Sequence, residues 1–317
     1  MKTKRAALLC VVLLAGAYAV AQSPAGEEEE GVRTRALWNT AFLNRRPPKP
    51  EPKSSAGGTA VASVPKPKPA PPAGEPKASA PARTLAEVGK LGSAFVGVTL
   101  WRMTRDLGSV PAVRFRGLVH EEDPEGTAEW TPQRVSLKSQ FEQRDMVRLS
   151  VESAREGYLY IIDRDVYADG TMSAPTLIFP TLRLREGNNK VRPGVPYEIP
   201  EPTDKPPAFR MKKTRADQVA IRITMIVSPQ PIREIRIGRS AQKLDPAKAA
   251  EWEAKWGQEV VQLEDPKLIG QAYSQAEARA AQEVDSLGSD DPLPTSLFRS
   301  AASEDQPMLV NLTLNMK

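Results

Sequence analysis

The sequence predicts a mainly β fold: an antiparallel β-sandwich, Ig-like or barrel-like, with a short two-helix insertion near the C-terminus, preceded by a disordered Pro-rich arm. Three observations support this prediction. Short alternating apolar runs, separated by turn residues, recur after residue 84. The apolar period becomes helical between residues 244 and 287. Of the 30 prolines, 11 lie between residues 45 and 83, where little apolar mass offsets the entropy of ordering.

Residues 1–21 have the composition of a signal peptide. Three cations within the first five residues precede an apolar run, and Ala19-Val-Ala21 has the A-x-A spacing of a cleavage site. We expect cleavage after Ala21, with an uncleaved N-terminal anchor as the alternative. The single cysteine, Cys10, lies in this leader. The mature chain is therefore expected to be exported (periplasmic, cell-envelope associated or secreted), and to fold without disulfides.

Residues 22–83 are expected to be disordered, as an acidic tail followed by a Pro/Lys/Ala-rich linker. A weakly ordered tail is expected at residues 22–43. Two alternatives stay open, one face of a short helix or a docking segment, because of the spacing of Leu37, Trp38, Phe42 and Leu43. Residues 44–83 favour polyproline II, in which about 40 residues extend on the order of 100 Å.

The charge distribution bounds the function classes. The formal net charge is +5, but residues 84–317 contain 31 basic and 33 acidic side chains, so the excess belongs to the leader and linker. This argues against a specific nucleic-acid-binding domain. With one His and one Cys in the chain, most metal, thiol and triad chemistry is disfavoured, and we expect no cofactor. His120 is expected in an exposed turn, with an oxygen-dominated metal site as the alternative.

A β-rich domain is expected from residue 84 to residue 317. Its predicted strands are the apolar runs at 95–101, 113–119, 146–151, 158–162, 176–179, 219–227, 232–237 and 308–316. Asp169-Gly170 is typical of a hairpin turn. The acids between Asp163 and Asp169 also resemble a calcium loop in part, and a weak calcium site is the alternative.

Two helices are expected within the insertion at 244–287. Asp245-Pro246 and Asp265-Pro266 each combine an N-cap residue with proline at the first helical position. Trp252 and Trp256 are one turn apart, so they lie on one face of the first helix. That face is expected either to pack on the sheet or to be exposed as a partner site.

Several residues in order resemble the bacterial family known as domain of unknown function 4384, over residues 137–231. The marks are Phe141, Asp145, Arg148 and Leu149, Gly157-Tyr-Leu-Tyr160, Leu177-Ile-Phe-Pro180, Asn188-Asn189, Val191, Gly194, Tyr197-Glu-Ile-Pro200 and Ile226-Val-Ser-Pro229. The family tends to have Gly-Asp where Arg144-Asp145 stands. The resemblance implies a β-rich extracytoplasmic or accessory module. It transfers no catalytic residue.

Three groups of residues are candidates for a partner surface. They are the same-face pair Tyr158 and Tyr160, the basic cluster Arg210, Lys212, Lys213 and Arg215, and the pair Trp252 and Trp256. Each also has a structural interpretation, as framework or as a solvated loop.

The sequence favours a non-catalytic accessory or interaction module of the cell envelope. Its expected partner is an unidentified envelope protein or an anionic cell-wall polymer. No transmembrane segment is expected to remain after signal cleavage. The alternatives are an envelope enzyme that uses carboxylate or Ser/Lys chemistry, and a purely structural envelope component.

Overall fold

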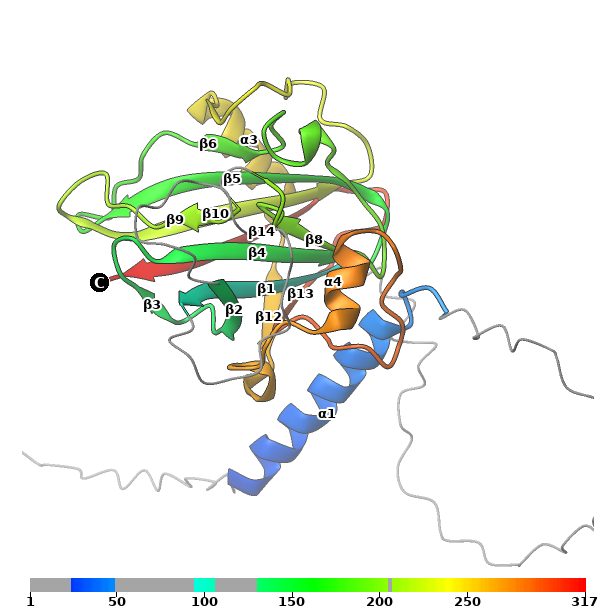
Figure 1. The fold of residues 1–317 in the computed structure, drawn as a ribbon. Coiled ribbons are helices and arrows are strands. Elements are labelled where there is room, and N and C mark those ends of the chain that lie inside the picture. Colours follow the sequence, from blue (N-terminus) through cyan, green and yellow to red (C-terminus); the bar gives the residue numbers. More distant parts are fainter. Residues whose placement is uncertain (1–23, 49–93, 106–129, 205–206) are drawn as a thin grey trace, which may run out of the picture. The chain divides into compact units, whose positions relative to one another are not determined.

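The computed structural model describes residues 24–48, 94–105, 130–204 and 207–317. The chain divides into two units, Met1–Leu37 and Trp38–Lys317. Helix α1 (Pro24–Leu43) begins in the first unit and ends in the second. All other elements belong to the second unit (Figure 1). Within the described residues, no helix is long and apolar enough to cross a membrane.

The second unit contains two β-sheets. Strands of the first sheet follow the order β12 (Val260–Glu264), β13 (Ser296–Ser300), β1 (Ala94–Arg105), β4 (Met146–Ser153) and β8 (Pro196–Ile199), with β2 (Trp130–Val135) paired to β1 and β9 (Phe209–Arg210) paired to β4. Strands of the second sheet follow the order β11 (Gln242–Lys243), β6 (Thr176–Phe179), β5 (Gly157–Tyr167), β10 (Gln218–Ser228), β14 (Met308–Met316) and β3 (Gln140–Phe141), with β7 (Lys190–Val191) paired to β5.

The two sheets pack face to face, as the sandwich prediction requires. All their strand pairs are antiparallel except the short pairing of β14 with β3. Alternate side chains of each strand fill one continuous core, including Val98, Leu100, Leu149, Val151, Leu159, Ile161, Met225, Phe298, Val310 and Leu312. This alternation is the period of two that placed the strands in the sequence.

Each sheet is also covered on its outer side. Helix α3 (Pro246–Trp256) packs on the outer face of the second sheet, where Trp252 contacts a cluster that includes Ile226 and Leu309. The outer face of the first sheet is covered by Trp38 and Phe42 at the end of α1, and by residues around α4 (Gln275–Ala281). Aromatic side chains on both outer faces are therefore buried, and so are charged side chains on the first sheet.

Most predicted strands are confirmed. The runs at 95–101, 146–151, 158–162, 176–179, 219–227 and 308–316 all lie in strands. The hairpin turn is confirmed as well, because Gly170 has φ +81° and its N–H bonds the carbonyl of Tyr167. The run at 113–119 lies outside the described residues.

The strand predicted at 232–237 is wrong. Prolines at 229 and 231 take the chain out of the sheet after β10, and residues 233–234 form a turn. Ile232 still reaches the outer cluster of the second sheet, and its N–H donates to the Tyr160 hydroxyl at 2.9 Å. The apolar residues of this run therefore belong to a loop that packs on the sheet.

Both predicted helices of the insertion are present, but the second begins later than expected. Asp245 accepts the N–H of Ala247 and caps α3 as predicted. Asp265 begins only a 3-10 turn, η2 (Pro266–Leu268), and α4 begins at Gln275 with a capping box between Ser274 and Glu277. Strand β12 lies between the helices and pairs with β13, which follows α4. The sequence predicts neither strand.

The N-terminal tail also differs from its expectation. Residues 24–43 are helical instead of weakly ordered, and Trp38, Phe42 and Arg46 are buried against the sandwich. Of the residues in the predicted helix face, Trp38 and Phe42 are buried, whereas Leu37 is 44% exposed. The leader at 1–21, the linker from residue 49 and the expected domain start at residue 84 lie outside the described residues.

Candidate functional site

Four of the aromatic candidates meet on the outer face of the second sheet. Tyr158 and Tyr160 come from β5, and Trp252 and Trp256 come from α3. Tyr160 is buried, and its hydroxyl is occupied by the N–H of Ile232. Tyr158 is partly buried against the same cluster. Tyr160 therefore has the contacts of a framework residue.

The sequence left two roles open for the tryptophan pair, packing on the sheet or exposure as a partner site, and each role belongs to one of the two residues. Their rings stack with centroids 5.9 Å apart and an interplanar angle of 9°. Trp252 is only 3% exposed and packs on the sheet, whereas Trp256 is partly exposed. Trp252 thus fixes the orientation of a second indole that remains accessible. A rigid, accessible aromatic ring loses little entropy when it binds a partner.

Trp256 borders an open groove of ≈ 280 Å³, which we call the tryptophan groove. One wall is α3, and the other is the loop that follows β10. Its lining residues are Ser228, Gln230, Pro231, Ile232, Arg233, Glu234, Glu251, Trp252, Lys255 and Trp256. This volume is close to the lower end of the range for small-ligand sites, about 300 Å³.

The charges around the tryptophan groove are unequally paired. Lys248 bridges both acids, with its Nζ 2.8 Å from Glu251 and 3.6 Å from Glu234. The hydrogen bond with Lys248 lowers the pKa of Glu251. Arg233 and Lys255 are exposed and have no hydrogen bond or ion pair with any described residue, although the charge of Lys255 also lowers the pKa of Glu251. Three cations, Arg233, Lys248 and Lys255, thus face two acids, Glu234 and Glu251, which leaves one net positive charge beside the aromatic surface.

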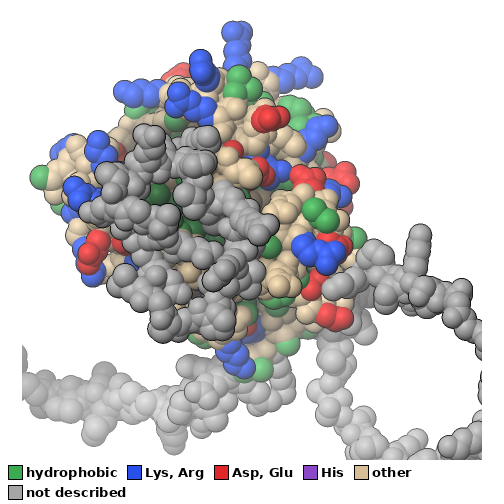
Figure 2. All heavy atoms as spheres, viewed as in Figure 1, with side chains coloured by type: hydrophobic (Ala, Val, Ile, Leu, Met, Phe, Trp, Pro, Cys, Tyr) green, Lys and Arg blue, Asp and Glu red, His purple; other side chains and the backbone are tan. Residues whose placement is uncertain are grey.

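Lysine and arginine side chains also project from the upper edge of the molecule in Figure 2, where Figure 1 draws α3 and the loop before it. This part of the surface is therefore rich in cations beyond the two that line the groove.

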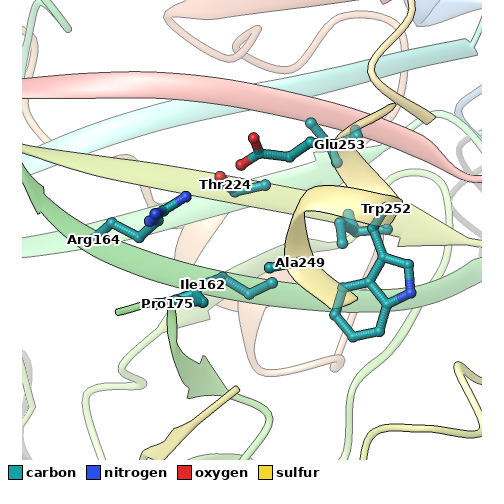
Figure 3. A pocket seen from close by; sticks show the side chains of 9 residues that line it. Ile162, Arg164, Pro175, Thr224, Ala249, Trp252 and Glu253 are labelled. Atoms are coloured by element: carbon teal, nitrogen blue, oxygen red, sulfur yellow. The ribbon is translucent and has the colours of Figure 1, made fainter. Parts of the chain in front are cut away.

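A second, much smaller cavity lies along α3, between the helix and the sheet. Its volume is ≈ 10 Å³, and Figure 3 shows Ala249 and Trp252 of α3 near Ile162 and Thr224 of the sheet. The Thr224 hydroxyl donates to Asn311 at 2.6 Å. Such a volume is about that of one water molecule, so this cavity is a packing gap and not a ligand site.

The basic cluster lies far from the tryptophan groove. Arg210 is in β9, and Lys212, Lys213 and Arg215 lie between β9 and the start of β10. The groove lies at the other end of β10, about 33 Å away for an 11-residue strand. Arg215 is paired with Asp217 at 2.6 Å and stands over the Tyr167 ring. The sequence candidates therefore form two separate surfaces.

The acids between Asp163 and Asp169 turn to different partners. Asp169 accepts from the N–H and hydroxyl of Thr171, while Asp165 accepts from Thr214 and Gln218. In the part of the chain that the structure describes, no three His, Cys, Asp or Glu side chains gather as a metal site would require. Their arrangement is that of a hairpin with local caps. His120 lies outside the described residues.

Asp163 is the most perturbed carboxyl of this hairpin. Burial, and then the nearby charge of Asp165, raise its pKa to about 6. Its Oδ1 atom is buried and has no hydrogen-bond partner among the residues that the structure describes. Asp163 is on the core-facing side of β5, opposite Ile223 in β10, so it does not reach the tryptophan groove.

A buried ionic layer on the first sheet was not predicted. It contains the pairs Arg46–Glu152, Arg134–Glu277 and Arg148–Glu198. Burial raises the pKa of both Glu152 and Glu198. In the sequence, Arg148, Ser150 and Glu152 alternate with apolar residues and look like the solvent face of a strand. No local signal shows that α4 and the 38–48 segment cover them.

Sequence reasoning also missed the cations of the tryptophan groove. The apolar alternation predicts a strand at Arg233, and no sequence pattern marks Lys255. The unusual run Pro229-Gln-Pro231 was the signal that the chain leaves the sheet there.

The comparisons with known proteins agree with the resemblance seen in the sequence. Residues 140–231 match the family described as domain of unknown function (DUF4384). No curated protein and no solved structure matches the chain. Arg144, where the family tends to have glycine, has φ +81°, a conformation that favours glycine. The matched segment contains β3 to β10 and therefore strands of both sheets. Residues 140–231 of this chain are thus similar to the DUF4384 domain.

Proposed function

We propose that this chain is a non-catalytic interaction module of the cell envelope and that the tryptophan groove is its binding site. The observation that carries the proposal is Trp256, a partly exposed indole held by a buried one at the border of an open groove. Export rests on the leader-like composition of residues 1–21.

The partners of the groove's polar groups favour binding over catalysis. The carboxylates of Glu234 and Glu251 both form ion pairs with Lys248, and this contact lowers the pKa of Glu251, which makes it a weaker base. Ser228 is buried, and its hydroxyl donates to the Gln230 carbonyl at 2.6 Å. The groups that remain available are cations and an aromatic ring, which bind ligands but do not abstract protons at neutral pH.

Site-specific photo-crosslinking in the native envelope tests the proposal. A photoreactive phenylalanine analogue replaces Trp256, and the matched control carries it at Val261, which is 49% exposed on β12 of the other sheet. We expect a discrete crosslinked product from position 256 and none from position 261. Equal labelling from both positions, or none from position 256, would contradict the proposal.

A further inference from the structure

We propose that the tryptophan groove binds an acidic sugar, with the sugar ring on Trp256 and its carboxylate between Arg233 and Lys255. This inference rests on the proposed function and names the ligand class of the same site. Three properties of the groove lead to it: its surface chemistry, its net positive charge and its size.

The aromatic wall favours a compact ring with an apolar face. Trp256 cannot turn freely, because its ring stacks on Trp252, which is anchored among Tyr160, Ile226 and Leu309. A fixed indole at a wet border suits a ligand that is apolar on one face and polar around its edge. Sugar rings have this combination, since their C–H groups gather on one face and their hydroxyls project outward.

The excess of cations in and beside the groove favours a carboxylate on that ring. Lys248 pairs with both acids of the groove and the charge of Lys255 also acts on Glu251, so the three cations exceed the two acids by one positive charge. The guanidinium of Arg233 matches a carboxylate in a two-pronged geometry, and Lys255 adds a second positive charge. The charge complement of the groove is therefore an anion.

The shape of the groove favours a sugar over an acidic peptide. Its walls are a helix and a loop, so there is no strand edge on which a peptide could extend the sheet. A groove volume of ≈ 280 Å³ is also too small for an amphipathic helix, which needs apolar contacts over several turns. One or two ring-sized units fit this space more naturally.

Calorimetric titration of the mature full chain tests the inference with three probes: trigalacturonate, its methyl ester and tetraglutamate. We expect trigalacturonate to bind. Its affinity should fall about tenfold or more in Arg233→Gln/Lys255→Gln, because charged hydrogen bonds are lost. Trp256→Ala should cause a similar loss, and Trp256→Phe a smaller one. The methyl ester should bind the wild type about tenfold more weakly and respond little to removal of the cations.

The matched control is Arg236→Gln/Arg239→Gln, which removes the same charge from exposed positions outside the groove. It should change trigalacturonate affinity less than about twofold. Equal losses in the control and in the groove variant would overturn the inference, because they indicate general electrostatic attraction. An affinity that Trp256→Ala leaves unchanged would overturn it as well.

Two outcomes separate this inference from the proposed function. If tetraglutamate binds with the same dependence on Trp256 and the two cations while trigalacturonate does not, the ligand class is wrong and the groove remains a binding site. If none of the probes binds, the acidic-sugar inference fails, and crosslinking from position 256 alone decides the proposed function.

Discussion

Arg46 donates from Nε and Nη2 to the two carboxylate oxygens of Glu152, at 2.7 and 2.8 Å, in an ion pair whose side chains are 1% and 3% exposed. Its guanidinium also bonds the carbonyls of Gly288, Asp291 and Pro292. Segment 38–48 is therefore part of the sandwich unit. The Pro-rich residues that follow it connect two segments of the same folded body, 38–48 and β1.

Replacing Arg46 with alanine should destabilise the protein by about 3–5 kcal/mol, because it leaves the buried carboxylate of Glu152 without a counter-ion. Thermal and denaturant unfolding measure this loss. Arg45→Ala is the matched control, since Arg45 pairs with Glu304 at the surface, where ion pairs contribute about 0–1 kcal/mol. Equal effects of the two substitutions would refute the structural role of Arg46.

Cutting the linker should not release the N-terminal segment. A protease site placed at Gly57-Gly58 would separate the chain into two pieces, and we expect them to co-elute in native size-exclusion chromatography. Gly97 and Gly194 leave no room for a Cβ beside Phe42, Pro294 and Pro47, so the docked segment is closely packed. The Arg46→Ala variant should lose the small piece. Separation of the wild-type pieces after cleavage would show that the docking is weak.

Asp163 should make stability depend on pH. Its pKa of about 6 in the folded state is above the ordinary value near 3.9. The folded state therefore holds the proton more tightly, and the stability that this proton contributes at low pH is lost as the pH rises through 6.

Asp163→Asn should remove the cost of the buried charge. At pH 7.5 it should stabilise the protein by about 2–3 kcal/mol, and at pH 3.5 it should have little effect. Urea unfolding at both pH values measures the difference. Asp169→Asn is the contrast, because it weakens hydrogen bonds from the N–H and hydroxyl of Thr171 and should not stabilise. A pH-independent effect of Asp163→Asn would show that burial does not govern this carboxyl.

The two stacked tryptophans should respond differently to substitution. Trp252→Ala should cost about 3–5 kcal/mol of stability, as expected for a buried indole. Trp256→Ala should cost less, because part of its ring remains in water. Comparable losses of melting temperature in the two variants would mean that Trp256 is as much a core residue as Trp252.

The sequence was most informative where a pattern is local. The alternation along β10 and β14 places both strands, and Asp245-Pro246 begins α3 at the residue expected. Strand β13 was missed because Ser296-Leu-Phe-Arg-Ser300 has only two apolar residues. Its polar side chains are buried by neighbours that are distant in sequence.

The site could be predicted only in part for the same reason. Trp252 and Trp256 pair because they are one helical turn apart, which the sequence shows directly. Arg233 and Lys255 line one groove because of how the chain leaves β10 and how α3 lies across the sheet, and neither is encoded in a local motif. The buried ion pairs are similar, because Arg46 and Glu152 are 106 residues apart.

The most direct test of the binding-site proposal is ¹⁹F NMR of the full chain with fluorinated tryptophan. The five tryptophans, Trp38, Trp101, Trp130, Trp252 and Trp256, are assigned from single Trp→Phe variants, and trigalacturonate is then titrated. Binding in the groove predicts a saturable shift of the Trp256 resonance, a smaller shift of Trp252 and none for Trp38 or Trp101, which lie on the other sheet. A shift centred on Trp38 or Trp101, or no shift of Trp256 at any concentration, would contradict the account.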